Sequence, residues 1–413
     1  MPLIKPFRGL RPVVARAGDV VAPPYDVVST EEARDLVAGR PWSFLHISRP
    51  EVDLPEGTDP YASGVYAKAA QNLERMIEEG VLVRDPHECF YVYRLTMGEH
   101  VQTGLVAVAS VQAYDGDRIR KHEFTRPVKE DDRVRQIDAL NAQTGPVFLV
   151  YRAERAVDDA LAGMVANTPD VDVTAVDGVR HELWVADDPG LIERLTVAFD
   201  AMEALYVADG HHRSAAASRV AAARREADPG HCGDESYNYF LSVVFPHDQM
   251  QILDYNRVVR DLHGEDVEGF LGHVRARFTV EPGDGPVRPE GPGHFGMYLA
   301  GHWYRLALDP GRIPWDDPVG RLDVSLLANE LIQPILGISD PRRDERIDFV
   351  GGVRGLGELQ RRVDEAGWAV AFSLYPTRME DLMSVADAGE VMPPKSTWFE
   401  PKLADGLVTH VLD

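Results

Sequence analysis

Cysteine is scarce in this chain, and long hydrophobic runs are absent. The 413 residues include two cysteines, Cys89 and Cys232, and neither belongs to a CxxC pair or a zinc-binding pattern. A disulfide framework and a cysteine-based metal site are therefore not indicated. No apolar run reaches the roughly 20 residues that a membrane-spanning helix needs, and the N-terminal sequence MPLIKPFRGLRP lacks the apolar core of a signal peptide. We expect a cytoplasmic protein.

Basic residues are also few relative to acidic ones. Lys and Arg number 43 against 67 Asp and Glu, which gives a formal net charge of −24. So acidic a surface repels nucleic acid and anionic membranes, and we expect neither as a partner. An anionic small molecule stays compatible with this charge, because basic residues can gather locally. Two such clusters are Arg118, Arg120 and Lys121, and Arg342, Arg343 and Arg346, the second of which fits surface charge better.

The order of the predicted elements indicates the fold class. Ser29 and Glu32 form a capping box for a short helix near 30–38, and residues 61–79 have helical spacing. Further helices are expected at 129–142, 190–202, 211–226, 355–366 and 376–387, and strands at 89–96, 103–114, 146–151, 181–186, 204–208, 237–245, 250–255, 346–350 and 368–374. The strands mix hairpin-type and helix-separated connections. This pattern favours an α+β or mixed-sheet α/β fold over a doubly wound parallel sheet.

The length suggests two or three domains, or one large domain with a wide insertion. The stretch 281–293 (EPGDGPVRPEGPG) is dense in proline and glycine and is the expected loop or domain boundary. It would separate an N-terminal α+β region, 1–280, from a C-terminal α+β region, 294–413.

The most informative segment is ALYVADGHHRSAAASR, at 204–219. A predicted strand ends at Asp209, Gly210 lets the backbone approach a ligand closely, and an alanine-rich helix follows. The first turn of a helix leaves N–H groups unpaired, and its dipole favours an anion. Three side chains add donors and positive charge at this turn: His211, His212 and Arg213. We interpret the segment as a phosphate-binding turn, although a surface helix cap would have a similar sequence.

Six segments in a fixed order resemble a bacterial and archaeal family known as a conserved domain of unknown function, whose members carry ADGHHR. The segments are VAPPYDVVS (21–29), FLHISRPE (44–51), IRKHEFT (119–125), DGHHR (209–213), YNRVV (255–259) and MPPKSTWFEPKL (392–403). The DGHHR segment is also similar to the phosphate-binding motif of free-serine kinases, which have the ParB/sulfiredoxin-like fold. That resemblance implies a similar phosphate-binding region within a larger mixed-sheet protein. It further implies that DGHHR holds nucleotide phosphates and that an acidic residue activates the serine hydroxyl.

Two segments before residue 60 carry candidate substrate-binding residues. Pro23 and Pro24 stiffen the loop that presents Asp26 to a ligand; the alternative is a structural turn in which Asp26 accepts hydrogen bonds near a helix. In FLHISRP, Arg49 could bind a carboxylate or phosphate with two hydrogen bonds. The alternative is an arginine that faces solvent after an edge strand.

The IRKHEFT segment places an acid and a base together at a strand end. Glu123 is the candidate general base for a substrate hydroxyl, and His122 is a candidate substrate ligand. The segment is not an HExxH motif, so a zinc protease is unsupported. The alternative is a salt-bridged strand end.

The last two segments carry cationic candidates. Arg257 follows an apolar run and would either pair with an acid or contact phosphate. In MPPKSTWFEPKL the prolines make a rigid loop that presents Lys395, Ser396 and Lys402 to an anionic substrate. Trp398 and Phe399 would anchor this loop in the core.

These residues predict a nucleotide-dependent phosphotransferase that acts on a small hydroxyl metabolite, with free L-serine as the favoured acceptor, ATP or ADP as the donor and Mg²⁺ as the metal ion. The catalytic residues would be Asp209, Glu123 and His212, with Asp209 also the metal ligand. The phosphate-binding residues would be Gly210, His211, His212, Arg213, Arg257, Lys395 and Ser396, and the substrate-binding residues Asp26, Arg49, His122 and Lys402. The same residues would also serve a phosphoserine-type phosphatase, with His212 or Asp209 as nucleophile, or a non-enzymatic sensor of nucleotides or phosphometabolites.

Overall fold

The structure, a computed structural model, describes residues 1–413 and divides the chain into two compact units. Unit 1 comprises Met1–Met250 and Pro401–Asp413, and unit 2 comprises Gln251–Glu400. The stretch 281–293 lies inside unit 2 and does not separate the units. It begins with the last two residues of one strand and leads to the next strand of the same sheet. Its proline and glycine content therefore marks a loop within a sheet, which differs from the expected domain boundary.

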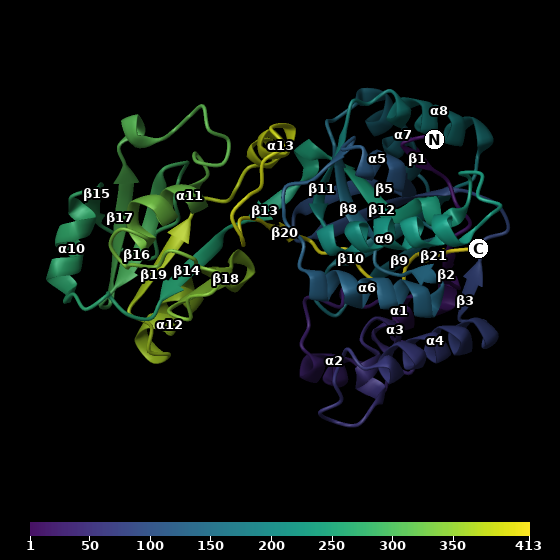
Figure 1. Cartoon of the computed structure of the whole chain (residues 1–413), viewed down its shortest axis with the longest axis horizontal. Coiled ribbons are helices and arrows are strands. Elements are labelled where there is room, and N and C mark those ends of the chain that lie inside the picture. The colour runs from purple at the N-terminus through teal and green to yellow at the C-terminus, as the bar shows by residue number, and fades with distance from the viewer. The chain divides into compact units, whose positions relative to one another are not determined.

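A mixed nine-stranded sheet forms the centre of unit 1 (Figure 1). Its strands are β1 (Ile4–Lys5), β4 (Phe90–Met97), β5 (His100–Ser110), β6 (Ile119–Arg120), β8 (Val147–Tyr151), β9 (Val171–Thr174), β10 (Arg180–Ala186), β11 (Leu205–Asp209) and β12 (Tyr239–Pro246). The strand order is β6-β11-β8-β12-β5-β4-β10-β9, and β1 pairs with β5. β6 is parallel to β11 and β8 to β12, whereas the other neighbours are antiparallel. This mixture confirms the predicted fold class.

The helices of unit 1 are α1 (Ala17–Val20), α2 (Thr30–Val37), α3 (Leu45–Ser48), α4 (Ser63–Glu78), α5 (Val111–Asp115), α6 (Pro127–Leu140), α7 (Arg155–Val165), α8 (Pro189–Asp200) and α9 (His211–Ala227). The predicted capping box is present at α2, where Ser29 and Glu32 each accept from the other's backbone N–H. Two pairs of short strands complete the unit, β2 (Leu10–Pro12) with β3 (Leu82–Arg84) and β7 (Ala142–Gln143) with β21 (His410–Val411).

The segment FLHISRP is a helix, α3, followed by a 3-10 turn, and the prediction of an edge strand there was wrong. All of its apolar residues are buried. In so short an apolar run, the spacing of apolar residues cannot distinguish a helix from a strand. One hydrophobic core in unit 1 contains residues of α7, α8 and α9 packed on the sheet, among them Leu161, Leu195 and Ala217. The small side chains of α9 let this helix lie close to the strands that carry the DGHHR turn.

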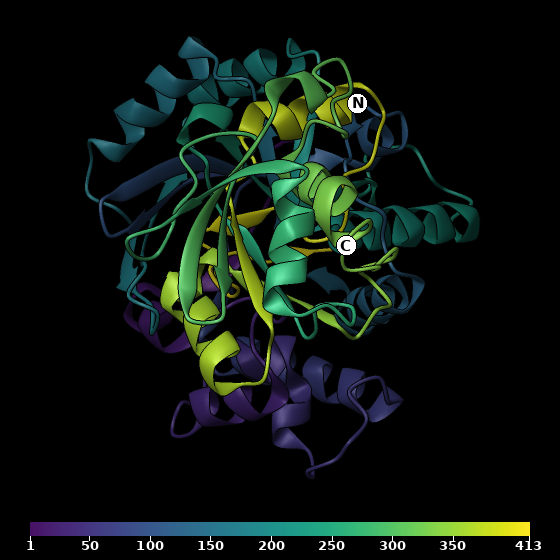
Figure 2. The same cartoon turned by 90° about the vertical axis from the view of Figure 1, so that its left-hand side faces the viewer.

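Unit 2 contains a six-stranded antiparallel sheet of order β15-β17-β16-β19-β14-β18. The bounds are β14 (Tyr255–Val259), β15 (Phe278–Pro282), β16 (His294–Leu299), β17 (His302–Leu308), β18 (Ile347–Gly351) and β19 (Val370–Leu374), and a separate pair is β13 (Gln251–Leu253) with β20 (Trp398–Glu400). The helices are α10 (Val267–Arg275), α11 (Asp323–Leu327), α12 (Gly355–Glu365) and α13 (Met379–Asp387). Helix α12 packs against β14, β16 and β19; Figure 2 turns this unit's strands toward the viewer.

Asn256 and Arg257 lie inside strand β14, whereas the sequence placed them after a strand. All five residues of this strand are buried, so the polar side chains of Asn256 and Arg257 do not mark the end of a strand. None of the helices in either unit combines the length and apolarity needed to cross a membrane.

Candidate phosphate-binding site

The DGHHR segment forms the turn from strand β11 to helix α9. The strand ends at Asp209 and the helix begins at His211, as the sequence predicts. Gly210 joins them with φ of +100°, a conformation that residues with a side chain rarely adopt. The pairing of β11 with β8 shifts register between Val207 and Asp209, so an irregularity of the strand directly precedes the turn. The backbone thus fixes where the glycine must stand.

The start of α9 offers backbone donors. The N–H groups of Arg213 and Ser214 both bond to the Gly210 carbonyl, at 2.9 and 3.0 Å, and no side chain caps this helix end. The N–H groups of His211 and His212 precede these first helical bonds and lie at the positive end of the helix dipole. This geometry suits an oxyanion such as phosphate.

Two ion pairs flank the turn. Nζ of Lys402 lies 3.4 Å from Oδ2 of Asp209, and Nη2 of Arg213 lies 3.3 Å from Oδ2 of Asp26. Burial alone would raise the pKa of Asp209, but the Lys402 and Arg213 cations hold it below its ordinary value. Asp209 is therefore ionised at neutral pH, within a group of cationic side chains.

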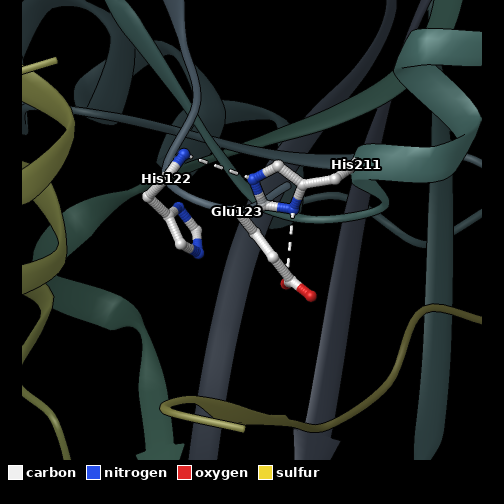
Figure 3. Close-up of side chains that lie close together, drawn as sticks. All are labelled: His122, Glu123 and His211. Atoms are coloured by element: carbon white, nitrogen blue, oxygen red, sulfur yellow. Dashed lines mark hydrogen bonds and ion pairs between the residues drawn. The ribbon is translucent and has the colours of Figure 1, made fainter. Parts of the chain in front are cut away.

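His211 is a neutral imidazole between two segments. Its Nε2 accepts the backbone N–H of His122 at 3.5 Å, and its Nδ1 lies 3.9 Å from Oε2 of Glu123 (Figure 3). Burial, together with the nearby His122 ring, holds the pKa of His211 well below its ordinary value. A neutral ring whose Nε2 accepts carries its proton on Nδ1, which faces Glu123.

His122 is a deeply buried polar residue beside this turn. Its side chain is 2% exposed, and neither ring nitrogen has a hydrogen-bond partner. Burial lowers its pKa to about 4, so this ring is also neutral. The His122 and His211 rings meet edge to face, with centroids 4.5 Å apart. An unpartnered buried imidazole is costly and calls for a functional explanation.

His212 holds the chain that follows β6. Its Nε2 accepts the backbone N–H of Arg126 at 3.0 Å, and burial lowers its pKa. A ring nitrogen that accepts this bond is not available to attack a phosphate. The geometry thus supports a positioning role for His212, which fixes the segment that carries Glu123.

A small cavity adjoins Arg213. It has a volume of about 30 Å³, and its lining includes Tyr25, Arg133, Arg213 and Asp405. The Cζ atom of Arg133 lies 3.9 Å from the centroid of the Tyr25 ring, and that of Arg213 lies 5.9 Å from it. A second cavity of about 50 Å³ shares Tyr25 and Arg133 and includes Arg49. Two guanidinium groups therefore meet one aromatic ring here. Arg133 is already paired with Asp132 at 2.7 Å and Arg213 with Asp26 at 3.3 Å.

Sequence reasoning missed Arg133 and Asp405. Arg133 belongs to the charged stretch PVKEDDRVRQIDAL, which resembles a solvent-facing helix, and only the fold shows that it is largely covered and packs against Tyr25. Asp405 is buried, its Oδ1 has no hydrogen-bond partner, and burial raises its pKa to about 7. No local pattern marks either residue.

The structure brings most of the predicted residues of unit 1 together. Those around the turn are Asp26, His122, Glu123, Asp209, Gly210, His211, His212, Arg213 and Lys402. Arg49 does not face solvent as the alternative expected: its Nε lies 3.1 Å from the buried Glu51 carboxylate, and its Nη2 donates to the Thr30 hydroxyl. Its role in substrate binding stays a prediction.

Three further predicted residues belong to unit 2: Arg257, Lys395 and Ser396. Arg257 contacts the loop that carries the other two. The Arg257 guanidinium donates to the carbonyl oxygens of Tyr255 and Lys395, and no acid pairs with it. Burial lowers the pKa of Arg257 to about 10. Ser396 donates to the Pro393 carbonyl at 2.6 Å. These bonds hold the proline-rich loop in place. Phe399 is buried, as expected of an anchor.

The two basic clusters are engaged in ordinary contacts. Arg118 bonds to the Asp200 side chain and to backbone carbonyls, and Lys121 donates to the Tyr114 carbonyl at 2.9 Å. Arg342 and Arg346 pair with nearby aspartates at 2.9 Å, which agrees with a role in surface charge.

Comparison with known proteins gives the family. The chain belongs to the family described as "Protein of unknown function (DUF1015)", whose model matches residues 4–325. No curated protein matches its sequence. Similar solved structures include a conserved hypothetical protein from Pyrococcus furiosus (12% identity, 73% of this chain, 94% of that chain, TM-score 0.34), a free serine kinase in complex with AMP (11%, 71%, 86%, 0.34) and SbnI with a C-terminal truncation from Staphylococcus aureus (14%, 73%, 86%, 0.37).

Proposed function

We propose that the chain is a nucleotide-dependent phosphotransferase that transfers a phosphoryl group to the hydroxyl of a small metabolite, with ATP or ADP as donor. The observation that carries the proposal is the β11–α9 turn, where unpaired N–H groups, a glycine and the Arg213 guanidinium meet. Phosphoryl transfer depends mainly on holding phosphates in line and neutralising their charge. The turn has the parts that this task requires.

The donor phosphates would bind at the start of α9. The N–H groups of His211 and His212 would donate to phosphate oxygens, and Lys402 and Arg213 would balance their charge. Arg213 is already fixed by Asp26 and by the Pro146 carbonyl, so its orientation needs little ordering on binding. Such fixed donors stabilise charge in the transition state without reorganisation.

The acceptor would lie between Glu123 and the arginine cavity. The Glu123 side chain is 50% exposed, so its carboxylate is accessible to a substrate hydroxyl and would act as its base. The 30 Å³ cavity between Arg133 and Arg213 is too small for a nucleotide base and suits a carboxylate. The acceptor would then be a compound with both a hydroxyl and a carboxylate, such as L-serine.

Mg²⁺ would enter with the nucleotide. Asp209 provides one ionised carboxylate, and Mg²⁺ is usually held by one or two carboxylates together with phosphate oxygens and water. The residues at the turn therefore fit the ion only when phosphate is present, since Lys402 already lies beside Asp209. The ion would neutralise charge on the transferred group.

Turnover by the full chain tests the proposal. The protein is mixed with Mg²⁺, L-serine and ATP or ADP, and phosphoserine is followed by ³¹P NMR. Glu123→Gln should lower kcat by about 100-fold or more, as expected for loss of a general base. Arg133→Met should raise KM for serine but not for the nucleotide. Arg84→Met, which removes a distant ion pair with Asp413, serves as the matched control.

Other outcomes select other functions. Nucleotide binding without product from any acceptor would overturn the kinase and leave a sensor. Phosphate release from phosphoserine without nucleotide would instead select a phosphatase.

A further inference from the structure

Three potential metal ligands lie together at the β11–α9 turn. The proposed function assigns no role to two of them, the imidazole rings of His122 and His211. His122, Glu123 and His211 each present one ligand atom, and these atoms all lie within 4.8 Å of one another. Figure 3 shows the three side chains gathered against each other. Two imidazoles and one carboxylate form a donor set that suits zinc and similar ions better than Mg²⁺.

We infer that His122, Glu123 and His211 form a binding site for one borderline divalent transition-metal ion of the Zn²⁺ class. The inference goes beyond the proposed function, because a sensor or a phosphatase could carry the same ion. In a metal-bound form the Glu123 carboxylate would be a ligand and would not serve as the base proposed above. Three protein ligands leave at least one position open for water or a substrate oxygen.

The unpartnered imidazole of His122 is the independent observation behind this site. Its nitrogens are buried and make no hydrogen bond of normal geometry, although the Val207 backbone lies nearby. Coordination by a metal ion would give one nitrogen the partner that the protein does not provide.

The ligands need a small adjustment to close on an ion. Zn–N and Zn–O bonds of about 2.0–2.2 Å place tetrahedral ligand atoms roughly 3.3–3.5 Å apart. Nδ1 of His211 and Oε2 of Glu123 are 3.9 Å apart, and the Glu123 side chain is half exposed. Coordination through Nδ1 moves the His211 proton to Nε2. It therefore gives up the contact from the His122 N–H, which at 3.5 Å is long for a hydrogen bond.

Co²⁺ is the probe for this site, because its visible absorption reports nitrogen ligands and coordination number. The full chain is stripped with a chelator and titrated with Co²⁺, and Zn²⁺ is then added to displace it. We expect one equivalent of Co²⁺ to bind, with absorption bands of a four- or five-coordinate ion. Glu123→Gln and His122→Ala should each weaken binding by about tenfold or more.

The matched control is Glu235→Gln. His231 and Glu235 form an ordinary pair at 2.9 Å in the same unit, and the change should leave Co²⁺ affinity unaltered. Because Glu123 is half exposed, its glutamine variant should keep the wild-type melting temperature even if His122→Ala does not. Absence of stoichiometric Co²⁺ binding, or equal affinity in wild type and Glu123→Gln, would overturn the site. Neither result depends on turnover, so the phosphotransferase is judged separately.

Discussion

Lys402 and Asp209 form an ion pair at 3.4 Å that joins the C-terminal segment of unit 1 to the end of strand β11. The two residues are 193 positions apart in the chain. The pair keeps Asp209 ionised at the turn and places a second cation beside Arg213. The C-terminal segment thus contributes directly to the charge of the proposed phosphate site.

A double-mutant cycle should measure how much the Lys402–Asp209 pair contributes to the free energy of unfolding. Lys402→Met should lower the free energy of unfolding by about 1 kcal/mol, because the partly buried carboxylate loses its partner. Urea denaturation of Lys402→Met, Asp209→Asn and the double variant gives the coupling. We expect Asp209→Asn to cost less in the Lys402→Met background. Strictly additive changes would show that the pair contributes nothing.

Gly210 should not tolerate a side chain. A Cβ atom there would lie 3.3 Å from Cα of Val147, and φ is +100°. Gly210→Ala should therefore lower the free energy of unfolding by about 1–3 kcal/mol. Gly163→Ala is the matched control, because that helical position has open space around it and should gain about 0.5–1 kcal/mol. Equal effects of the two substitutions would contradict the strained turn.

Asp405 should make stability depend on pH. Burial raises its pKa from 3.8 to about 7 in the folded protein, so the native state binds more protons than the unfolded state between these values. Stability from this group is thus present below pH 4 and is lost as the pH rises through 7.

Urea denaturation of wild type and Asp405→Asn at pH 5 and pH 8 isolates this contribution. We compare the free energy of unfolding of the variant with that of wild type at each pH. This difference should shift in favour of the variant by at least about 1 kcal/mol from pH 5 to pH 8. A difference between the proteins that is the same at both pH values would show that Asp405 titrates normally.

His212 should act through the backbone of Arg126. Without the ring, the Arg126 N–H loses its acceptor, and its hydrogen exchange should become about fivefold faster, which corresponds to about 1 kcal/mol. Mass spectrometry of peptides that cover residues 119–128 measures this in His212→Ala. His231→Ala should leave these peptides unchanged. Unaltered protection of Arg126 in His212→Ala would remove the positioning role.

The sequence was informative where function follows from local structure. The strand, the glycine and the helix of the DGHHR turn are adjacent in the chain, so their arrangement could be predicted with its donors. The capping box of α2 could be predicted for the same reason. Asp26, Glu123 and Lys402 came from other segments, and the structure places each beside this turn.

The errors arose where tertiary packing decides what a side chain contacts. Arg257, expected after a strand, lies inside one and is bound by backbone carbonyls. The burial that makes Arg133 and Asp405 important depends on segments far away in the chain. Periodicity and motif spacing contain none of this information.

The position of a bound nucleotide tests the central claim most directly. A crystal structure of the full chain grown with ADP and Mg²⁺ would show where the phosphates lie. We predict a phosphate within hydrogen-bond distance of the His211 and His212 N–H groups, with Arg213 and Lys402 beside it. Phosphates bound away from the β11–α9 turn, with this turn unchanged, would contradict the account.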